Sequence, residues 1–307
     1  MRIVITGPTG AIGHALIDLC LDKGIEVLAI CHRGSKRIGD LPVDKRVKII
    51  ELDMSEYDSV QNGEIRNLGK WDIFYHMAWN GTTGDDRNDT DLQQQNIKAT
   101  LAAVRLAHKL KCHTFIGAGS QAEYGRVNDV LRPNTPTFPE NGYGIAKLCA
   151  GQLSKIVCRQ LGIRHIWVRI LSVYGPYDGM NTMVISTIRK LLIDEMPMFT
   201  KGEQEWDYIY SRDAGEAMLA LGARGADGEI YVLGSGKARP LRYYIEIIRK
   251  AVGTNHEIAM GAIPYSSKQV MFLCADIEKL TVDTGFEPKT SFEKGVEETV
   301  NWVKNII

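Results

Sequence analysis

Near the start of the chain, residues 2–13 read RIVITGPTGAIG, and this stretch indicates the fold class. Residues 3–6 are a β-branched run that predicts a buried strand, and residues 11–23 carry apolar side chains at helical spacing. Between strand and helix lie Gly7, Gly10 and Gly13. In such a unit the first glycine permits a tight turn, the second lets the backbone approach a pyrophosphate, and the third lets the helix pack on the strand. Because N–H groups at a helix start favour phosphate, the stretch predicts a dinucleotide-binding site.

The alternation of short strands and longer helices continues after this stretch. Further strands are predicted at residues 26–30, 47–52, 72–77, 114–117 and 165–170, and helices at residues 89–110 and 141–161. Because strands that alternate with helices form parallel sheets, we predict an α/β fold with a Rossmann-type, doubly wound parallel sheet over residues 1–175. Residues 176–307 are less regular, with helices predicted at residues 183–192, 213–221 and 292–303. They are expected to form a smaller C-terminal substrate-binding lobe, with the chain crossing back to the Rossmann domain.

The composition of the 307 residues argues against several classes of protein. Lys and Arg number 37, as do Asp and Glu, so there is no general electrostatic attraction to nucleic acid or to an anionic membrane. An apolar run of roughly 18 residues, which a membrane-spanning helix needs, does not occur. The six cysteines form no Cys-x-x-Cys pair, and His and Cys do not cluster with zinc spacing. We therefore expect no metal, no nucleic-acid or membrane partner, and reduced thiols in a cytoplasmic protein.

The residues after the second strand bear on which nicotinamide cofactor binds. An NAD site usually places Asp or Glu there to bond the adenosine 2′-hydroxyl, whereas residues 31–37 read CHRGSKR. A 2′-phosphate could be met by Arg33, Ser35, Lys36 and Arg37, because a guanidinium binds phosphate bidentately. This loop predicts NADP(H), with a solvated basic loop and NAD(H) as the alternative. Asp53, at the end of the third strand, is expected to approach the adenine.

A tyrosine, a lysine and a serine are candidates for the chemistry. Tyr143 and Lys147 are four residues apart, which places them on one face of the predicted helix. A nearby ammonium favours the phenolate and brings a tyrosine closer to proton transfer at neutral pH. Ser120 follows the fifth strand, where its hydroxyl can bond a substrate oxygen beside the tyrosine.

These residues resemble the extended short-chain dehydrogenase/reductase family of NAD(P)-dependent sugar-nucleotide epimerases, dehydratases and ketoreductases. The resemblance covers essentially the whole length. Its markers are the glycine loop, Asp53, residues 76–78, Asn96, Ser120, Tyr143, Lys147, and residues 169–176 and 299–302.

The resemblance implies roles for individual residues. Tyr143 would move the proton of a sugar hydroxyl, Lys147 would hold the nicotinamide ribose, and Ser120 would polarise the sugar carbonyl. Cofactor contacts are implied for Gly7, Thr9, Gly10, Ala11, Ile12, Gly13, Asp53, Met54, Met77, Ala78, Asn96, Tyr143, Lys147 and Ile170. Contacts with a nucleotide-sugar substrate are expected from Trp79, Ser120, Ser172, Trp206 and Arg239. The helices at residues 89–110 and 141–161 resemble the pair that forms a four-helix dimer interface in relatives, so a homodimer is expected.

Departures from the family pattern bear on the reaction. Family 4,6-dehydratases carry an Asp-Glu pair directly after the catalytic Ser or Thr, whereas Gln121 and Ala122 stand here and cannot serve as acid and base. Glu123 comes one residue later and is expected to point to the other face of an extended segment. A dehydratase is therefore disfavoured. A non-enzymatic dinucleotide sensor is disfavoured too, because such proteins commonly lack the Tyr/Lys pair.

Two reactions remain, a 4-ketoreduction that consumes NADPH and a 4-epimerisation that usually retains NAD. The basic residues of the loop at 33–37 favour the reductase. Residues 202–208 and 270–276 resemble the 4-ketoreductases that make CDP-linked dideoxysugars, such as CDP-abequose synthase. We predict NADPH-dependent reduction of a nucleotide-linked 4-keto-6-deoxyhexose, serving polysaccharide synthesis, with an NAD-dependent nucleotide-sugar 4-epimerase as the alternative.

Overall fold

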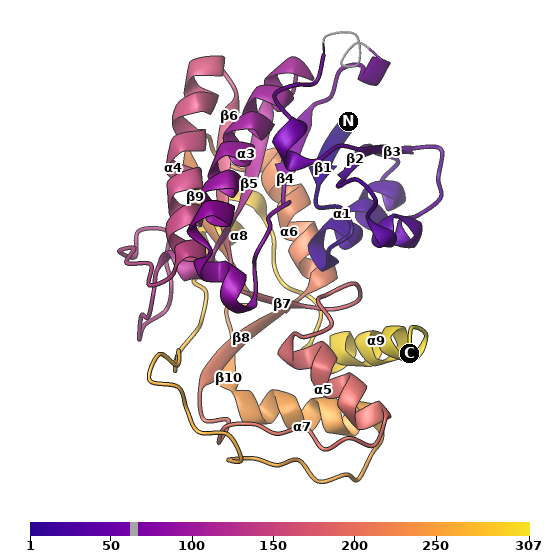
Figure 1. Ribbon diagram of the computed structural model, residues 1–307, viewed down its shortest axis with the longest axis vertical. Helices are drawn as coiled ribbons and strands as arrows, with labels where there is room; N and C mark the ends of the chain where they lie inside the picture. Colours follow the sequence, from indigo (N-terminus) through magenta and orange to yellow (C-terminus); the bar gives the residue numbers. More distant parts are fainter. Residues whose placement is uncertain (62–66) are drawn as a thin grey trace.

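A seven-stranded parallel sheet forms the centre of the protein (Figure 1). The computed structural model describes residues 1–61 and 67–307. The strand order is β3-β2-β1-β4-β5-β6-β9. The strands are β1 (Arg2–Thr6), β2 (Glu26–Cys31), β3 (Val47–Glu51), β4 (Ile73–His76), β5 (Thr114–Ser120), β6 (Arg164–Ile170) and β9 (Glu229–Leu233). The predicted α/β fold with a doubly wound parallel sheet is confirmed.

Helices cover both faces of this sheet. On one face α3 (Thr90–Lys109) packs against α4 (Gly142–Leu161), and on the other α1 (Ala11–Asp22) packs against α6 (Ser211–Arg224), which also contacts α8 (Glu278–Thr284). The apolar side chains of β1 alternate between these layers: Ile3 and Ile5 belong to the core under α1, and Val4 to the core under α3. Burial on both faces explains why the strands are almost continuously apolar in sequence.

The remaining elements form a smaller lobe at one end of the sheet (Figure 1). A three-stranded sheet, in the order β10-β8-β7, comprises β7 (Ser172–Tyr174), β8 (Glu205–Tyr210) and β10 (Ala238–Pro240). The helices of the lobe are α5 (Met183–Leu192), α7 (Leu241–Val252) and α9 (Phe292–Lys304), and they share one apolar core. The helices predicted in this half are confirmed, whereas β7 to β10, α7 and α8 are additional to the predicted elements. Strand β9 shows where the chain crosses back to the central sheet.

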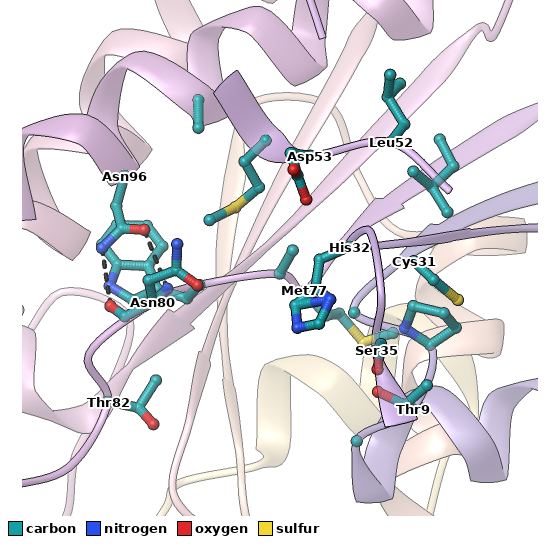
Figure 2. A pocket seen from close by; sticks show the side chains of 18 of the residues that line it. Thr9, Cys31, His32, Ser35, Leu52, Asp53, Met77, Asn80, Thr82 and Asn96 are labelled. Carbon is teal, nitrogen blue, oxygen red and sulfur yellow. Dashed lines mark hydrogen bonds between the residues drawn. The ribbon is translucent and has the colours of Figure 1, made fainter. Parts of the chain in front are cut away.

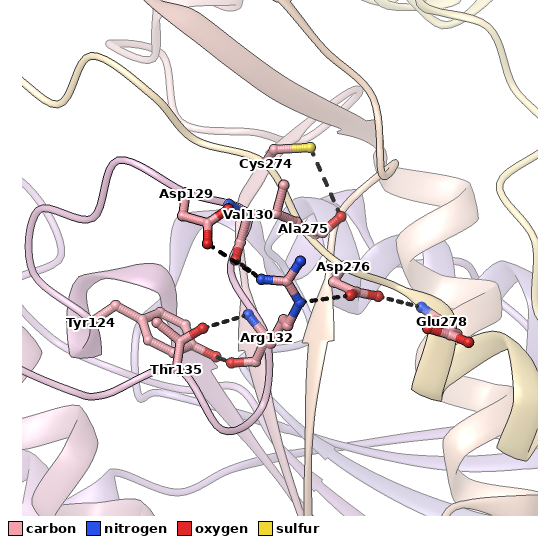
Figure 3. Close-up of polar contacts among 9 residues, drawn as sticks. All are labelled: Tyr124, Asp129, Val130, Arg132, Thr135, Cys274, Ala275, Asp276 and Glu278. Atoms are coloured by element: carbon pink, nitrogen blue, oxygen red, sulfur yellow. Dashed lines mark hydrogen bonds and ion pairs between the residues drawn. The ribbon is translucent and has the colours of Figure 1, made fainter.

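A loop that follows the fifth strand is joined to the lobe through its backbone (Figure 3). Leu131 pairs with Ala275 in a parallel bridge, and the Asp276 N–H donates to the Leu131 carbonyl at 2.9 Å. Arg132 adds an ion pair with Asp276 at 3.2 Å. The segment that leaves β5 is therefore fixed to residues 274–276 by its backbone and by an ion pair.

Within residues 1–61 and 67–307, no helix is both long and apolar enough to cross a membrane.

Candidate functional site

The glycine loop between β1 and α1 is shaped by close backbone contacts. Gly7 has φ of +69°, and a Cβ there would lie 2.8 Å from the Ala78 nitrogen. A Cβ on Gly13 would lie 2.5 Å from the Gly7 carbonyl oxygen. At Gly10, in contrast, a Cβ would meet only the Gly7 carbonyl oxygen, at 3.7 Å. Gly7 and Gly13 are thus required by packing within the protein, whereas the backbone at Gly10 faces open space.

That open space belongs to a cavity of about 890 Å³ at the carboxyl ends of the strands (Figure 2). Gly10 is also the N-cap of α1. Because glycine has no side chain that could cap the helix, the first N–H groups of α1 are free to bind phosphate. Most predicted cofactor residues line the cavity: Gly7, Thr9, Gly10, Ala11, Ser35, Arg37, Asp53, Met54, Met77, Ala78 and Asn96. Its volume and its glycine floor fit a dinucleotide.

Buried polar contacts hold the wall of the cavity after β4. His76 Nδ1 lies 2.9 Å from the Thr6 hydroxyl, and its Nε2 lies 3.2 Å from the Thr100 hydroxyl. Burial lowers the pKa of His76 to about 3, so the ring is neutral. The Asn96 amide accepts from the Asn80 N–H at 3.0 Å and donates to the Asn80 carbonyl at 2.9 Å (Figure 2). Asn96 therefore holds the backbone of the segment after β4, which forms this wall of the cavity.

The loop after β2 is surrounded by carboxylates. The guanidinium of Arg33 donates to both oxygens of Glu56, at 2.9 Å and 3.1 Å. The Arg33 N–H donates to Asp53 at 2.9 Å, and the Gly34 N–H donates to Glu51 at 2.8 Å. Arg33 does not line the cavity, and neither does the exposed Lys36. Two of the four side chains expected to meet a 2′-phosphate therefore lie outside the cavity.

Ser35 and Arg37 do line the cavity, together with a turn from the lobe. Arg37 Nη2 donates to the Tyr177 carbonyl at 2.6 Å, and the Tyr177 ring stacks on His14 with centroids 3.5 Å apart. Asp178 follows in the same lining, and burial raises its pKa to about 6. This turn, the Gly-Pro-Tyr-Asp-Gly sequence at residues 175–179, was absent from the predicted site.

Ser120 and Tyr143 lie together beside the cavity. Ser120 ends β5, and Tyr143 lies in the first turn of α4, whose N-cap Asn141 accepts from the Gly144 N–H. Burial raises the pKa of the Tyr143 phenol, while a hydrogen bond with Ser120 and the positive charge of Arg87 act in the opposite direction. The ionisation of this phenol therefore depends on these two neighbours.

Lys147 lies under Tyr143 and contacts an indole. Its Nζ donates to the Ala118 carbonyl at 2.6 Å and lies 3.7 Å from the ring centroid of Trp79. The Tyr143 ring packs edge-on against Trp79, with centroids 6.0 Å apart. Since Trp79 lines the cavity, this indole connects the Tyr143/Lys147 pair to the dinucleotide site. Burial lowers the pKa of Lys147 to about 7, and the negative charge of Glu123 opposes that shift.

The prediction for Glu123 was wrong in its local geometry. Residues Gln121–Glu123 form a short 3-10 helix rather than an extended segment, and Ser120 and Glu123 form a capping box. Glu123 accepts from the Ser120 N–H at 2.8 Å and the Trp167 indole at 2.9 Å, and forms an ion pair with Arg169 at 2.8 Å. Its side chain is 0% exposed. Glu123 is thus fully engaged beneath the site and has no access to a substrate.

Two of the substrate residues expected in the lobe contact one another. The Trp206 indole N–H donates to the Ser172 hydroxyl at 2.8 Å, and Trp206 packs on an apolar cluster that includes Tyr124. Arg239 is exposed on β10, opposite Trp206. These three residues do not line the large cavity. Apart from Arg33 and Lys36, the other predicted residues that do not line it are Ile12, Gly13, Ser120, Tyr143, Lys147 and Ile170.

Several cavity residues had no counterpart among the predicted ones. They include Cys31, His32, Leu52, Asn80, Thr82 and Tyr177 (Figure 2 shows the first five). Cys31 ends β2, and His32 and Leu52 directly follow β2 and β3, so their position at the carboxyl end of a parallel strand was an available signal.

The comparisons with known proteins agree with this geometry. The model of the "NAD dependent epimerase/dehydratase family" matches residues 3–234. The chain belongs to this family of oxidoreductase-type enzymes. It is 25% identical over 320 residues to a UDP-glucuronate 4-epimerase of Thermodesulfobacterium geofontis, with 99% of this chain and 96% of that protein covered. It is 24% identical to a dTDP-glucose 4,6-dehydratase of Mycolicibacterium smegmatis, with 99% of this chain and 93% of the relative covered.

The fold is also found among solved structures. A UDP-N-acetylglucosamine 4-epimerase from Methanobrevibacter ruminantium, in complex with UDP-N-acetylmuramic acid, superimposes with a TM-score of 0.89. The two chains are 22% identical, and the match covers 100% of this chain and 99% of the other. At this identity the likeness concerns the fold.

Proposed function

We propose that the protein is an NAD-dependent nucleotide-sugar 4-epimerase. The observation that carries this proposal is the pairing of Arg33 with Glu56, which turns the expected 2′-phosphate ligand away from the cavity. The epimerases among the similar proteins support the same reaction. The substrate would be a sugar linked to a nucleoside diphosphate, bound between the dinucleotide cavity and the lobe. We further propose that residues 1–175 bind the cofactor and residues 176–307 the substrate.

The charge around the loop after β2 favours NAD over NADP. Glu51, Asp53 and Glu56 all contact the backbone or side chains of residues 33–34. A 2′-phosphate at this place would face three carboxylates, whereas a 2′-hydroxyl could donate to one of them. Asp53 lines the cavity and is the best placed to accept. Retained NAD is what an epimerase needs, since its reaction has no net oxidation.

The roles proposed for Tyr143, Ser120 and Lys147 follow from their contacts. The bound nicotinamide supplies the hydride acceptor and donor next to C4 of the sugar. Tyr143 would take the proton of the C4 hydroxyl and later return it, and Ser120 would hold the C4 oxygen. Lys147 is fixed by the Ala118 carbonyl within the same cluster. Dehydration is not supported, because Glu123 is buried in its ion pair with Arg169.

A second candidate is the NADPH-dependent reduction of a 4-keto-6-deoxyhexose. Ser35 and Arg37 favour it, because both line the cavity and could contact a 2′-phosphate.

The first experiment separates these two reactions. The purified protein is denatured and the supernatant assayed for NAD, and the native protein is incubated with UDP-glucuronate, UDP-glucose and UDP-N-acetylglucosamine. We expect NAD to be released on denaturation. We also expect NMR to show formation of a 4-epimer, with no added cofactor consumed. Net oxidation of NADPH by a CDP- or dTDP-4-keto-6-deoxyglucose, with no NAD released, would overturn the epimerase and establish the reductase.

Changing Glu56 to Gln is expected to alter cofactor preference. The variant frees Arg33 from its partner, while the amide oxygen can still accept from the Asp53 N–H, as Glu56 does at 2.9 Å. We expect about a tenfold gain in NADP affinity relative to NAD, or about 1.4 kcal/mol, by titration calorimetry on cofactor-free protein. The double variant Glu56→Gln/Arg33→Ala should lose this gain. A gain that persists in the double variant would show that Arg33 is not its source.

We propose a homodimer that forms through α3 and α4. Ile145, Leu153 and Ile156 are exposed on α4, at 55%, 38% and 54%, and Cys149 continues the stripe between them. Their spacing places them on one face of the helix. An apolar face of this kind is typical of an interface, and a second copy of α4 is a self-complementary partner for it.

We also propose a cytoplasmic location. The six thiols are free and five are buried, which supports it.

Changing Ile156 to Asp is expected to give a monomer. The carboxylate would have to lose its water against the apolar face of the partner helix, which opposes association. Sedimentation velocity should show a dimer for the unchanged protein and about half that mass for the variant. Val282→Asp, on α8 and 75% exposed in the unchanged protein, is the matched control and should stay dimeric. A monomeric unchanged protein would refute the interface.

A further inference from the structure

A second cation lies against Tyr143, from outside the helix that carries it. Arg87 belongs to the short 3-10 helix η3 (Gly84–Asn88), and its Cζ lies 4.4 Å from the centroid of the Tyr143 ring. Its Nη1 donates to the Thr82 carbonyl at 2.8 Å. Among the described residues no carboxylate forms an ion pair with Arg87, so its charge is not neutralised by an acid.

The position of Arg87 is fixed by contacts between η3 and the start of α4. The Gly142 N–H donates to the Asn88 side chain at 3.0 Å. A Cβ on Gly142 would lie 2.9 Å from the Arg87 carbonyl oxygen, so only glycine permits this approach. Tyr143 is the next residue. The backbone of Arg87 and Asn88 is therefore in direct contact with Gly142, the residue before Tyr143.

Lys147, the other cation near Tyr143, is directed elsewhere. Its Nζ lies 5.8 Å from the Tyr143 centroid, against 3.7 Å from the Trp79 centroid, and it donates to the Ala118 carbonyl. Burial lowers the pKa of Lys147 to about 7, so part of the population is neutral at physiological pH. A guanidinium keeps its charge throughout this range. Arg87 is consequently the permanent positive charge on the phenol.

We propose that Arg87 is a positioning residue that stabilises the phenolate of Tyr143 during proton transfer, an inference that rests on the proposed function. A cation over an aromatic face is attracted by the ring, and the attraction is greater when the ring carries the phenolate charge. The charged groups that face Tyr143 are Arg87 from η3, Lys147 from α4 and Glu123 from the 3-10 helix after β5. Glu123 opposes ionisation of the phenol, and its ion pair with Arg169 limits that effect.

The test measures the ionisation of Tyr143 without any substrate. The ultraviolet difference between the Tyr143 protein and its Tyr143→Phe counterpart isolates this phenol. It is recorded against pH in four backgrounds: the unchanged protein and three variants. Arg87→Gln should raise the pKa of Tyr143 by about one unit, and Arg87→Lys should restore most of the shift. Arg159→Gln removes an exposed cation from the far end of α4 and should change nothing. In Arg87→Gln the pH profile of kcat should shift upward together with the pKa of Tyr143. On the acidic side of the profile kcat should then fall about tenfold.

Each outcome decides between a charge effect and a merely structural one. A lower kcat at every pH, with the pKa of Tyr143 unchanged in Arg87→Gln, would overturn the proposal. A shift equal in Arg87→Gln and Arg87→Lys would overturn it too, because the charge would then be irrelevant. Since the titration needs no turnover, a shifted phenol in a protein that shows no epimerisation supports the role of Arg87 and refutes only the proposed function.

Discussion

Replacing Tyr143 by Phe is expected to reduce kcat by about 10²–10⁴-fold, the usual contribution of a positioned acid or base. The substitution removes only the hydroxyl, so the ring keeps its edge-on contact with Trp79 and its contact with Arg87. Affinity for NAD should therefore change by less than about threefold, or about 0.7 kcal/mol. Turnover is followed by NMR of the epimerised sugar, and NAD binding by calorimetry.

The control for this prediction is a tyrosine of the lobe. Tyr243 lies on α7, is 42% exposed, and donates to Glu293 at 2.8 Å on the surface. Tyr243→Phe removes the same hydroxyl and should leave kcat and NAD affinity unchanged. If Tyr143→Phe turned over at the rate of the unchanged protein, another group would have to move the proton and the proposed role of Tyr143 would be wrong.

Replacing Glu123 by Gln is expected to cause the largest loss of stability, about 3–5 kcal/mol in the free energy of unfolding. Both carboxylate oxygens accept hydrogen bonds: one from the Ser120 N–H and the Trp167 indole, the other from Arg169. A glutamine has one acceptor oxygen, so its NH2 group must face a donor in either orientation. Arg169, 3% exposed, would also lose its counter-charge.

Urea denaturation checks this value against a matched pair on the surface. Glu140 also pairs with an arginine, Arg126, in a bidentate contact, but both side chains are about 40% exposed. Glu140→Gln should therefore cost less than about 1 kcal/mol. The double variant Glu123→Leu/Arg169→Met, which removes both charges, should recover much of the stability lost in Glu123→Gln. Equal losses for Glu123→Gln and Glu140→Gln would contradict the assignment of a buried ion pair.

The Rossmann part could be predicted from the sequence because its pattern is local. Each βα unit places a buried apolar run next to an amphipathic helix, and the helix ends carry their own signals, such as Asn141 as the N-cap and Gly162, with φ of +69°, as the C-cap of α4. Strand β9 could not be placed in the same way. Its five residues do not encode that they pair with β6, some 60 positions earlier in the chain.

The candidate site was predictable where a residue's role depends on its own element. Gly10, Ser120 and Tyr143 follow from the loop, strand and helix that carry them. The direction of Arg33 depends on Glu56, 23 residues later, in a short 3-10 helix that folds back toward the loop. Glu123 was misjudged for a similar reason, since the tight turn after Ser120 replaces the assumed extended backbone. Arg87 carries no sequence signal, because its contact with Tyr143 joins separate segments.

A backbone link joins Leu131, in the loop after β5, to residues 274–276 (Figure 3), and the stack of Tyr177 on His14 joins the lobe to α1. The two parts of the protein are thus joined at two separate places, which restricts swinging of the lobe. Inversion at C4 requires hydrogen to leave one face of the sugar ring and return to the opposite face. For the proposed epimerisation, the ring would have to turn over within such a frame while the protein stays still. The nucleotide would then be the anchored end of the substrate, and the sugar the end held loosely enough to rotate.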